Sequence, residues 1–372
     1  MVYLKNPHRG DGLPVGPLPL ARSEMVAQLL SRCPRHAATP LRDLPELAAR
    51  HGIARLHLKD ESARMGLGSF KALGAAFVIA RAAQAASDGA AIDGRTLQGH
   101  TYVAASAGNH GLSVAAGARL FGARAVIFLA ETVPEGFADR LRAMGAEVQR
   151  AGATYEASMQ AAQDHAAAQG WTLLSDSSWE GYIELPTAVM EGYLQLAMEC
   201  AQQIAQPPTH ILLQAGVGGL AAAAARHFRA VWGDAPQIVV VEPDRAPALH
   251  DSIRAGWLVT ADGPVSSMGR LDCKTPSLVA LAGLSQDADA FVTITDAEAA
   301  AGVAELAAQG LPTTPSGAAG YAALACGLPG LGAEARVLGG DSQVAGEDDL
   351  QPAAQGEAVD GRDEGLRYGL AP

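Results

Sequence analysis

Cysteine is scarce in this chain, and the spacing of its few cysteines excludes two kinds of site. The four cysteines among the 372 residues are Cys33, Cys200, Cys273 and Cys326. Such wide spacing gives neither the disulfide framework of a small secreted domain nor the paired cysteines of a zinc site. We therefore expect reduced thiols, no bound metal and a cytoplasmic location.

Long apolar runs and basic runs are also missing. No apolar stretch reaches the roughly 18–20 residues that a membrane-spanning helix needs, and the chain does not begin with the pattern of a secretory signal. Acidic residues outnumber basic residues by 39 to 27, which gives a formal net charge of −12. Because an acidic surface disfavours nucleic acid, we expect neither a membrane nor a nucleic-acid partner.

The chain does have an apolar composition and a regular alternation of strands and helices. The expected strands are 55–59, 101–105, 125–129, 147–151, 171–174, 209–214, 237–241 and 290–294. The expected helices are 44–51, 69–86, one that follows the turn after strand 101–105 and ends at 120, 135–144, 155–169, 185–204, 218–232, 296–309 and 316–326. This alternation predicts an α/β fold of two lobes, with parallel-rich sheets covered by helices on both faces. Residues 1–35 are expected to form a polar arm, and the ordered core is expected to begin at Thr39.

One lysine stands where an ammonium group is costly to bury. Residues 66–71 read Gly-Leu-Gly-Ser-Phe-Lys, and a strongly apolar helical run follows Lys71 at once. Burial lowers the pKa of a lysine, and a neutral amine attacks a carbonyl to form a Schiff base. Lys71 is therefore a candidate covalent anchor for an aldehyde cofactor. The alternative is an ordinary lysine whose stem covers a helix N-terminus.

The turn after the predicted strand 101–105 is a candidate substrate site. It opens a helix, whose first backbone N–H groups favour an anion such as a carboxylate. The residues expected to contact substrate are Ser106, Ala107, Gly108 and His110. Asn109 carries a side chain that both donates and accepts hydrogen bonds and suits a ring hydroxyl. The alternatives are a capped helix start with a satisfied Asn109 and a structural role for His110.

A glycine-rich turn follows the predicted strand 209–214. Glycines at a strand-to-helix turn let backbone N–H groups close around a phosphate. The candidate phosphate-binding residues are Gly216, Val217, Gly218, Gly219 and Leu220. The same turn matches the dinucleotide fingerprint, and Glu242 lies at a distance along the chain that suits a ribose contact. A nicotinamide-dependent oxidoreductase is therefore an alternative, although it gives no role to Lys71.

A third candidate, Asp176, follows the predicted strand 171–174. Residues 175–182 read Ser-Asp-Ser-Ser-Trp-Glu-Gly-Tyr and precede a long helix. A carboxylate at a strand end is placed to move protons or to pair with a substrate amine. The alternative is an aspartate that only caps a helix or a turn.

Together these three turns resemble those of the fold-type II pyridoxal-phosphate enzymes. This is the tryptophan synthase β-like family, which includes threonine and serine dehydratases. The resemblance implies a two-lobe architecture in which pyridoxal 5′-phosphate is bound as a Schiff base to Lys71. It also implies that Phe70 lines the cofactor ring, that Asn109 lies beside its 3′-oxygen, and that residues 216–220 surround its phosphate.

From about Thr39 to Leu328 the chain is similar, more narrowly, to diaminopropionate ammonia-lyase, most specifically in residues 179–182 (Trp-Glu-Gly-Tyr). This likeness implies elimination of ammonia from 2,3-diaminopropionate to give pyruvate, with Asp176 in acid–base work on the L-isomer. The family carries an aspartate linked to the D-isomer where this chain has Ala107, so we expect the L-isomer to be favoured. The rest of that turn looks more like the hydroxy-amino-acid dehydratases. Dehydration of threonine, serine or 3-hydroxyaspartate is therefore the alternative.

The resemblance also implies how the chain is divided. The expected parts are a large cofactor-binding domain (1–80 and 190–340), a smaller α/β domain (81–189) and a disordered tail (341–372). Relatives end with an apolar strand and a Ser/Thr-Gly turn at the pyridine nitrogen, and Ser342 is the candidate for that contact here. Cys273 has no nearby cysteine with which to form a family disulfide. A homodimer is expected, as is common among relatives.

Overall fold

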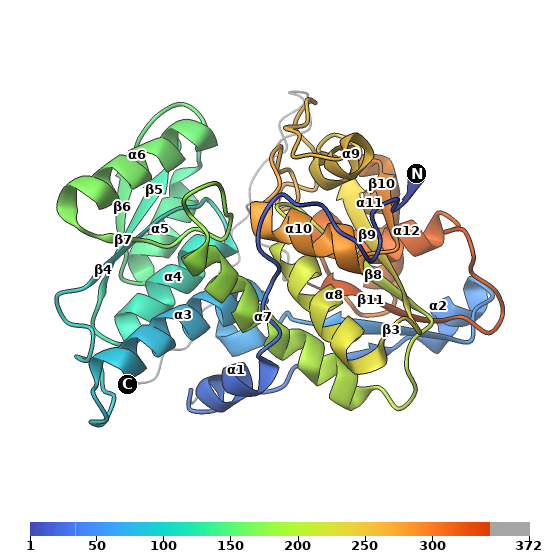
Figure 1. Cartoon of the computed structure of the whole chain (residues 1–372), viewed down its shortest axis with the longest axis horizontal. Helices are drawn as coiled ribbons and strands as arrows, with labels where there is room; N and C mark the ends of the chain where they lie inside the picture. The colour runs from blue at the N-terminus through green and yellow to red at the C-terminus, as the bar shows by residue number, and fades with distance from the viewer. Residues whose placement is uncertain (34, 343–372) are drawn as a thin grey trace, which may run out of the picture.

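A computed structural model of the chain describes residues 1–33 and 35–342, and its strands form two sheets (Figure 1). The large sheet runs, in spatial order, β1 (Val2–Lys5), β10 (Ala290–Ile294), β9 (Gln237–Pro243), β8 (His210–Gln214), β11 (Arg336–Ser342), β3 (Arg55–Asp60) and β2 (Leu41–Asp43). The small sheet runs β6 (Glu147–Arg150), β5 (Arg124–Leu129), β4 (Thr101–Ala105) and β7 (Thr172–Leu173). Among the described strands, only the edge strands β1 and β2 are antiparallel to their neighbours. The predicted α/β class with two parallel-rich sheets is confirmed.

Helices cover both sheets, and most of them lie within a residue or two of their predicted bounds. They are α1 (Ser23–Leu30), α2 (Pro45–Arg50), α3 (Lys71–Ala86), α4 (Asn109–Leu120), α5 (Glu135–Ala143), α6 (Tyr155–Gln169), α7 (Glu184–Gln203), α8 (Gly219–Trp232), α9 (Ala248–Ala255), α10 (Leu278–Asp287), α11 (Asp296–Ala308) and α12 (Pro315–Ala325), with a short 3-10 turn η1 (Arg64–Gly66). Among the described helices, none combines the length and apolarity needed to cross a membrane.

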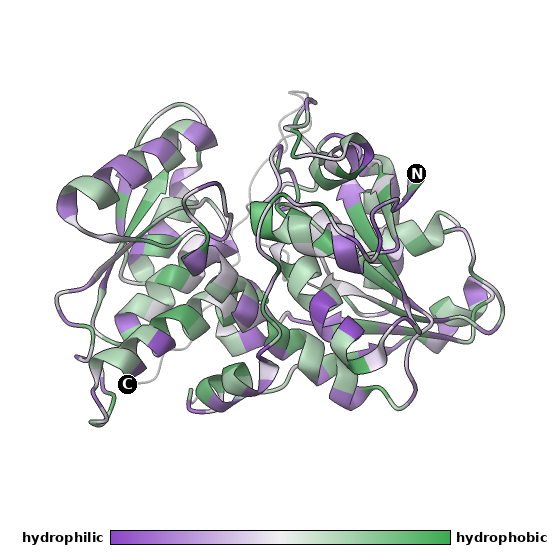
Figure 2. Ribbon diagram, in the orientation of Figure 1, coloured by the Kyte–Doolittle hydropathy of each residue, from purple (hydrophilic) through white to green (hydrophobic). Residues whose placement is uncertain are grey.

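Alternate side chains of the central strands pack on opposite faces of the large sheet. On β8, Ile211 and Leu213 belong to the core shared with α8 and α10, whereas Leu212 belongs to the core shared with α12. Strands that are apolar on both faces are typical of a parallel sheet covered by helices on both sides. Figure 2 shows mostly hydrophobic central strands and helices along which hydrophobic and hydrophilic residues alternate.

Helices α3 and α7 lie side by side between the two sheets (Figure 1). One apolar core continues from α8 through Leu194 on α7 and Phe77 on α3 to Ile127 in the small sheet. A glycine brings the two helices close, because a Cβ on Gly192 would stand only 2.5 Å from the carbonyl oxygen of Leu73. The two sheets therefore share a core, and the first turn of α3 is fixed against α7.

A buried group of charges fixes the chain just before α3. Glu199 on α7 pairs with Lys59 at 2.8 Å and with Arg64 at 2.7 Å, and Arg64 also pairs with Glu61 at 2.7 Å. Burial acts to raise the pKa of Glu199, but Arg64 and Lys59 outweigh it and lower the pKa to about 2. Buried charges persist only when they are paired and hydrogen-bonded. The group therefore ties β3 and η1 to α7 and fixes the loop that leads to Lys71.

The N-terminal arm differs from the prediction that the ordered core begins at Thr39, which is wrong. Strand β1 pairs antiparallel with β10, and the Asn6 side chain donates to the carbonyls of Ser285 at 2.8 Å and Ala288 at 2.7 Å. A short edge strand depends on its pairing with a neighbouring strand, and its own sequence need not show the alternation of apolar and polar residues that would predict it. The predicted tail was 341–372, but β11 runs to Ser342. Residues 343–372 and the side chain of Ser342 lie outside the described residues.

Candidate active site

Lys71 begins α3, and its ammonium faces Asp176. The Nζ of Lys71 donates to Oδ2 of Asp176 in a hydrogen-bonded ion pair, and the two side chains are 23% and 18% exposed. Asp176 follows β7 at the edge of the small sheet, whereas Lys71 follows η1 and the large sheet. The ion pair therefore links a loop that leaves the large sheet to a loop that leaves the small sheet.

This ion pair sets the charge of both groups. Burial acts to lower the pKa of Lys71, as predicted, but the Asp176 carboxylate outweighs burial and holds the pKa above its ordinary value. Burial acts to raise the pKa of Asp176, but Lys71 and His110 hold it below its usual range. The expectation of a neutral lysine is therefore wrong for the paired state. A nucleophilic or basic role for Lys71 requires that Asp176 be drawn to another cation.

Two aromatic rings enclose the Lys71 side chain. Its Nζ lies 5.4 Å from the ring centroid of Phe70 and 5.9 Å from that of Tyr193, and the two rings meet edge to face at 5.0 Å. Tyr193 comes from α7 and is fully buried, and its hydroxyl has no hydrogen-bond partner of ordinary geometry among the described residues. The sequence analysis missed Tyr193, whose only signal is Gly192, the glycine that lets α7 approach α3.

Ser106 organises the turn between β4 and α4. Its Oγ accepts the N–H groups of Gly108 at 3.3 Å and Gly111 at 3.1 Å. A substrate carboxylate in this turn would therefore have to use the other N–H groups. Ala107 is exposed, and the space where a Cβ of Gly108 would stand is open. The turn thus leaves room for a ligand beside Asn109, which is the first residue of α4.

His110 connects α4 to the end of β7. Because a carbonyl only accepts, Nε2 of His110 donates in its 2.8 Å contact with the Leu174 oxygen. The other nitrogen, Nδ1, is buried and has no hydrogen-bond partner within the described part of the chain. Burial lowers the pKa of this ring, on which Asp176 and Lys71 also act. His110 therefore has a structural bond on one nitrogen and an open acceptor near the ion pair on the other.

The Trp-Glu-Gly-Tyr string supports the strand end that carries Asp176. The rings of Trp179 and Tyr182 stack with their centroids 4.4 Å apart. The Tyr182 hydroxyl donates to the carbonyl of Leu173 at 2.7 Å and accepts from the N–H of Ser175 at 3.1 Å. Asp176 follows directly, so the string fixes its backbone.

The turn between β8 and α8 has no room for side chains. A Cβ on Gly216 would stand 3.0 Å from the Sγ of Cys273 and 3.1 Å from the carbonyl oxygen of Arg270. Gly218 has a φ of +95°, which favours glycine, and it directly precedes α8. Cys273 is a free thiol, as expected, and burial raises its pKa to about 11. Backbone N–H groups at a helix start, without side chains over them, suit a phosphate.

Glu242 is not available to a ribose. It is fully buried, and its carboxylate accepts the N–H groups of Leu249 at 2.8 Å and His250 at 2.7 Å at the start of α9. Burial raises its pKa to about 8. Glu242 therefore caps a helix, which removes the ribose contact expected for a nicotinamide-dependent oxidoreductase.

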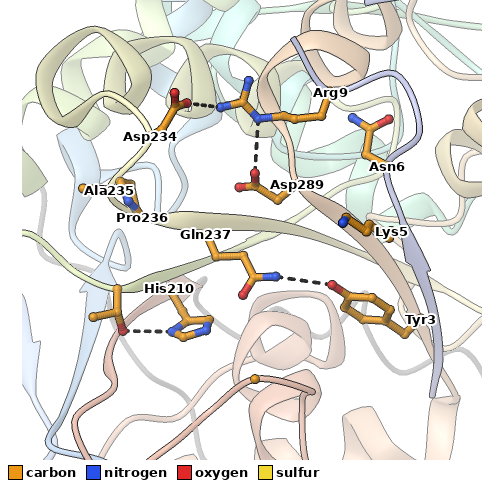
Figure 3. A pocket seen from close by; sticks show the side chains of 12 residues that line it. Tyr3, Lys5, Asn6, Arg9, His210, Asp234, Ala235, Pro236, Gln237 and Asp289 are labelled. Atoms are coloured by element: carbon orange, nitrogen blue, oxygen red, sulfur yellow. Dashed lines mark hydrogen bonds and ion pairs between the residues drawn. The ribbon is translucent and has the colours of Figure 1, made fainter.

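A separate cavity of about 480 Å³ lies at the amino ends of β8 and β9 (Figure 3). Arg9 pairs there with Asp234 and, at 3.2 Å, with Asp289. Gln237 donates to the hydroxyl of Tyr3 at 3.3 Å. None of the predicted site residues lines this cavity. The candidate active site is therefore the region around Lys71 and Asp176.

A family model described as pyridoxal-phosphate dependent enzyme matches residues 33–339. The chain belongs to this family. Diaminopropionate ammonia-lyase from Salmonella typhimurium is similar to this pyridoxal-phosphate dependent enzyme, with 32% identity over 291 residues that cover 73% of this chain and 72% of the relative. Human L-serine dehydratase/L-threonine deaminase is 28% identical over 281 residues, 74% of this chain and 78% of the relative.

The structural comparison agrees with the family. The crystal structure of Escherichia coli diaminopropionate ammonia-lyase in complex with an aminoacrylate-PLP azomethine reaction intermediate matches this pyridoxal-phosphate dependent enzyme with a TM-score of 0.82. The identity is 29%, and the match covers 94% of each chain. The fold-type II architecture and the resemblance to diaminopropionate ammonia-lyase are therefore confirmed.

Proposed function

We propose that this enzyme eliminates ammonia from 2,3-diaminopropionate, with the L-isomer favoured. One molecule of substrate and one of water give pyruvate and two of ammonia. The observation that carries the proposal is the ion pair of Lys71 and Asp176 at the carboxyl ends of the strands. Relatives that are diaminopropionate ammonia-lyases support it.

The residues around Lys71 fit pyridoxal phosphate. Lys71 supplies an amine for the cofactor aldehyde, and the N–H groups of residues 216–220 supply an anion site for its phosphate. We assign Phe70 to the cofactor ring and Asn109 to its 3′-oxygen. When bound, the cofactor withdraws electrons from the α-carbon of the substrate and makes its proton acidic.

Asp176 and Lys71 divide the proton chemistry between them. A substrate ammonium competes with Lys71 for the Asp176 carboxylate. Once Asp176 pairs with the substrate, burial lowers the pKa of Lys71, and its neutral amine accepts the α-proton. We assign the remaining contacts to the turn between β4 and α4, where Ser106, Ala107, Gly108 and His110 would border the substrate.

The charge of Asp176 favours an amine as the leaving group. When the carbon–nitrogen bond breaks with its electron pair on nitrogen, a β-ammonium leaves as neutral ammonia and needs no further proton. A hydroxyl must be protonated to leave, and the Asp176 carboxylate is a poor acid as long as Lys71 holds its pKa below its usual range. The released enamine hydrolyses in water to pyruvate and the second ammonia.

Dehydration of L-threonine or L-serine is the second candidate. The Ser-Ala-Gly-Asn-His turn at 106–110 resembles that of the dehydratases, and the human relative is an L-serine dehydratase/L-threonine deaminase. Its catalysis would need a proton donor, and Nδ1 of His110, an open acceptor in the described site, would have to gain a proton before it could serve as one.

The test is the stoichiometry of the products from the cofactor-loaded enzyme. Two ammonia per pyruvate from L-2,3-diaminopropionate are expected. One ammonia per 2-oxo acid from L-threonine or L-serine, with none from diaminopropionate, would replace the proposal with the second candidate. The homodimer, the cytoplasmic location and the division into domains 1–80 with 190–340 and 81–189 stay predictions.

A further inference from the structure

Tyr193 places a buried hydroxyl beside Lys71. The residue is 1% exposed, and its hydroxyl makes no hydrogen bond of ordinary geometry to any described group. Lys71 nevertheless lies close enough for its ammonium to act on the phenol. An unpaired buried hydroxyl destabilises the folded state, and most buried polar groups in proteins do have a partner. The open hydroxyl therefore points to a partner that appears during the reaction.

The packing around Tyr193 holds the phenol ring in one place. A Cβ on Gly74 would stand 2.7 Å from Cε1 of the ring, and a Cβ on Gly219 would stand 3.7 Å from Cε2. The edge of the ring also contacts Phe70. The first turns of α3 and α8 thus clamp the ring, and its hydroxyl cannot swing to a different partner.

The charged groups near this hydroxyl keep it protonated. Burial raises the pKa of Tyr193 above its ordinary value, Lys71 acts to lower it, and Asp176 acts to raise it further. In the paired state burial acts to lower the pKa of Lys71, whereas Asp176, Tyr193 and Cys273 each act to raise it. Tyr193 therefore offers a neutral O–H group. Such a donor stabilises the lone pair of a neutral amine, whereas a phenolate would stabilise the ammonium.

We propose that Tyr193 is a positioning residue for Lys71, donating a hydrogen bond to its neutral amine when a substrate ammonium draws Asp176 away. The amine then keeps a buried partner in both states of the site, the carboxylate before substrate binds and the phenol afterwards. The inference rests on the proposed function only in requiring a cation that competes for Asp176.

The test measures how fast the cofactor-free protein gains its visible absorbance band after pyridoxal phosphate is added, as a function of pH. The rate rises as Lys71 loses its proton, and the midpoint of this rise reports the pKa of Lys71. Asp176→Asn removes the carboxylate and imitates the state in which it is engaged elsewhere. Tyr193→Phe removes only the hydroxyl and keeps the clamped ring. Both variants and their combination form a double-mutant cycle.

In the Asp176→Asn protein, adding Tyr193→Phe is expected to raise the midpoint by about one pH unit. This shift corresponds to the free energy of one hydrogen bond that stabilises the neutral amine. With Asp176 present, the same change is expected to move it by no more than about 0.3 unit, because the carboxylate dominates. Tyr321→Phe is the matched control. Tyr321 lies on α12, and its hydroxyl is hydrogen-bonded to His51 at 3.0 Å. The loss of this hydroxyl should leave the midpoint unchanged.

Equal midpoints for Asp176→Asn with and without the Tyr193 hydroxyl would overturn the inference while leaving the proposed function intact. A wild-type protein that gains no band at all would overturn the proposed function and the inference with it. A second readout uses the rate on diaminopropionate. In Tyr193→Phe the rise of kcat with pH should move to higher pH, while KM stays within about twofold. A rise at the same pH as in the wild type would count against the proposal.

Discussion

Lys71 and Asp176 are 105 residues apart in the chain and form an ion pair in the folded protein. The pair makes Asp176 a counter-ion before substrate arrives and Lys71 an ammonium that cannot yet act as a base. A substrate that brings its own ammonium exchanges one cation for another, which costs less than leaving the buried carboxylate unpaired. Release of the base is thus coupled to binding of a cationic substrate.

Replacing Lys71 with alanine should abolish turnover and the visible absorbance of the cofactor-loaded protein, because the amine that would hold the cofactor is gone. Borohydride treatment should fix the cofactor covalently to the wild-type chain but not to Lys71→Ala, as measured by mass spectrometry. Lys5→Ala is the control, since Lys5, the last residue of β1, lines the separate cavity. A Lys71→Ala protein with full activity would end the proposal.

Asp176→Asn should lower the rate of elimination about 100-fold or more, because the leaving ammonium loses its counter-ion. The same change should lower the pKa of Lys71, since the carboxylate that raises it is gone. With the pKa of Lys71 raised and that of Asp176 lowered, the native pair persists throughout neutral pH. Ammonia release and cofactor binding, each followed from pH 6 to 10, would separate the two effects. Unchanged kinetics would remove Asp176 from the mechanism.

Ala107→Asp should add activity on D-2,3-diaminopropionate. Ala107 is exposed at the tip of its turn, and the neighbouring space at Gly108 is open, so a carboxylate fits without repacking. The resemblance to diaminopropionate ammonia-lyase links an aspartate at this position to the D-isomer. Ala107→Asn is the matched control, similar in shape but unable to take a proton. The measurement is pyruvate release from each isomer, and equal D-isomer rates for both variants would refute the role of the charge.

Gly216→Ala should weaken cofactor binding about tenfold or more, because the new methyl group would stand 3.0 Å from Cys273 and 3.1 Å from the Arg270 carbonyl. The turn must shift, and its N–H groups shift with it. Gly136→Ala on α5 serves as the control, since its Cβ would meet nothing within 4 Å. Titration of the cofactor-free proteins with pyridoxal phosphate measures the change. Equal affinity for both variants would place the phosphate elsewhere.

Glu199→Gln should destabilise the fold by about 3–5 kcal/mol, because Lys59 and Arg64 lose a buried partner. The pKa of Glu199 is lowered from its ordinary value of 4.5 to about 2, so its contribution is full above pH 4.5 and is lost as the pH falls toward 2. Urea denaturation at several pH values measures both effects. Glu147→Gln, which breaks only an exposed pair with Arg124, should cost little.

The order of strands and helices could be predicted because most elements alternate with polar turns. Strand β4, helix α6 and strand β10 begin and end at the expected residues. Helix α10 was missed for a physical reason. It is buried nearly all round, from Val279 to Ser285, so it lacks the polar face that produces a helical period.

The candidate site was only partly predictable for a similar reason. Lys71 and the glycines near 216 stand out because such residues are costly in those places unless they have a use. The contact between Lys71 and Asp176 depends on how two sheets are packed together, which no local pattern records. The open hydroxyl of Tyr193 is likewise a property of the packed helices, and in the sequence it is one tyrosine in an apolar helix.

The glycine crossing of α3 and α7 has a consequence for engineering. A methyl group on Gly74 would meet the Tyr193 ring at 2.7 Å, and one on Gly192 would meet the Leu73 carbonyl at 2.5 Å. Either substitution would push α3, which begins with Lys71, away from α7. The position of Lys71 would change although neither residue is assigned a contact with the substrate. A variant library aimed at new leaving groups should therefore keep positions 74 and 192 invariant and diversify position 107, where the chain tolerates bulk.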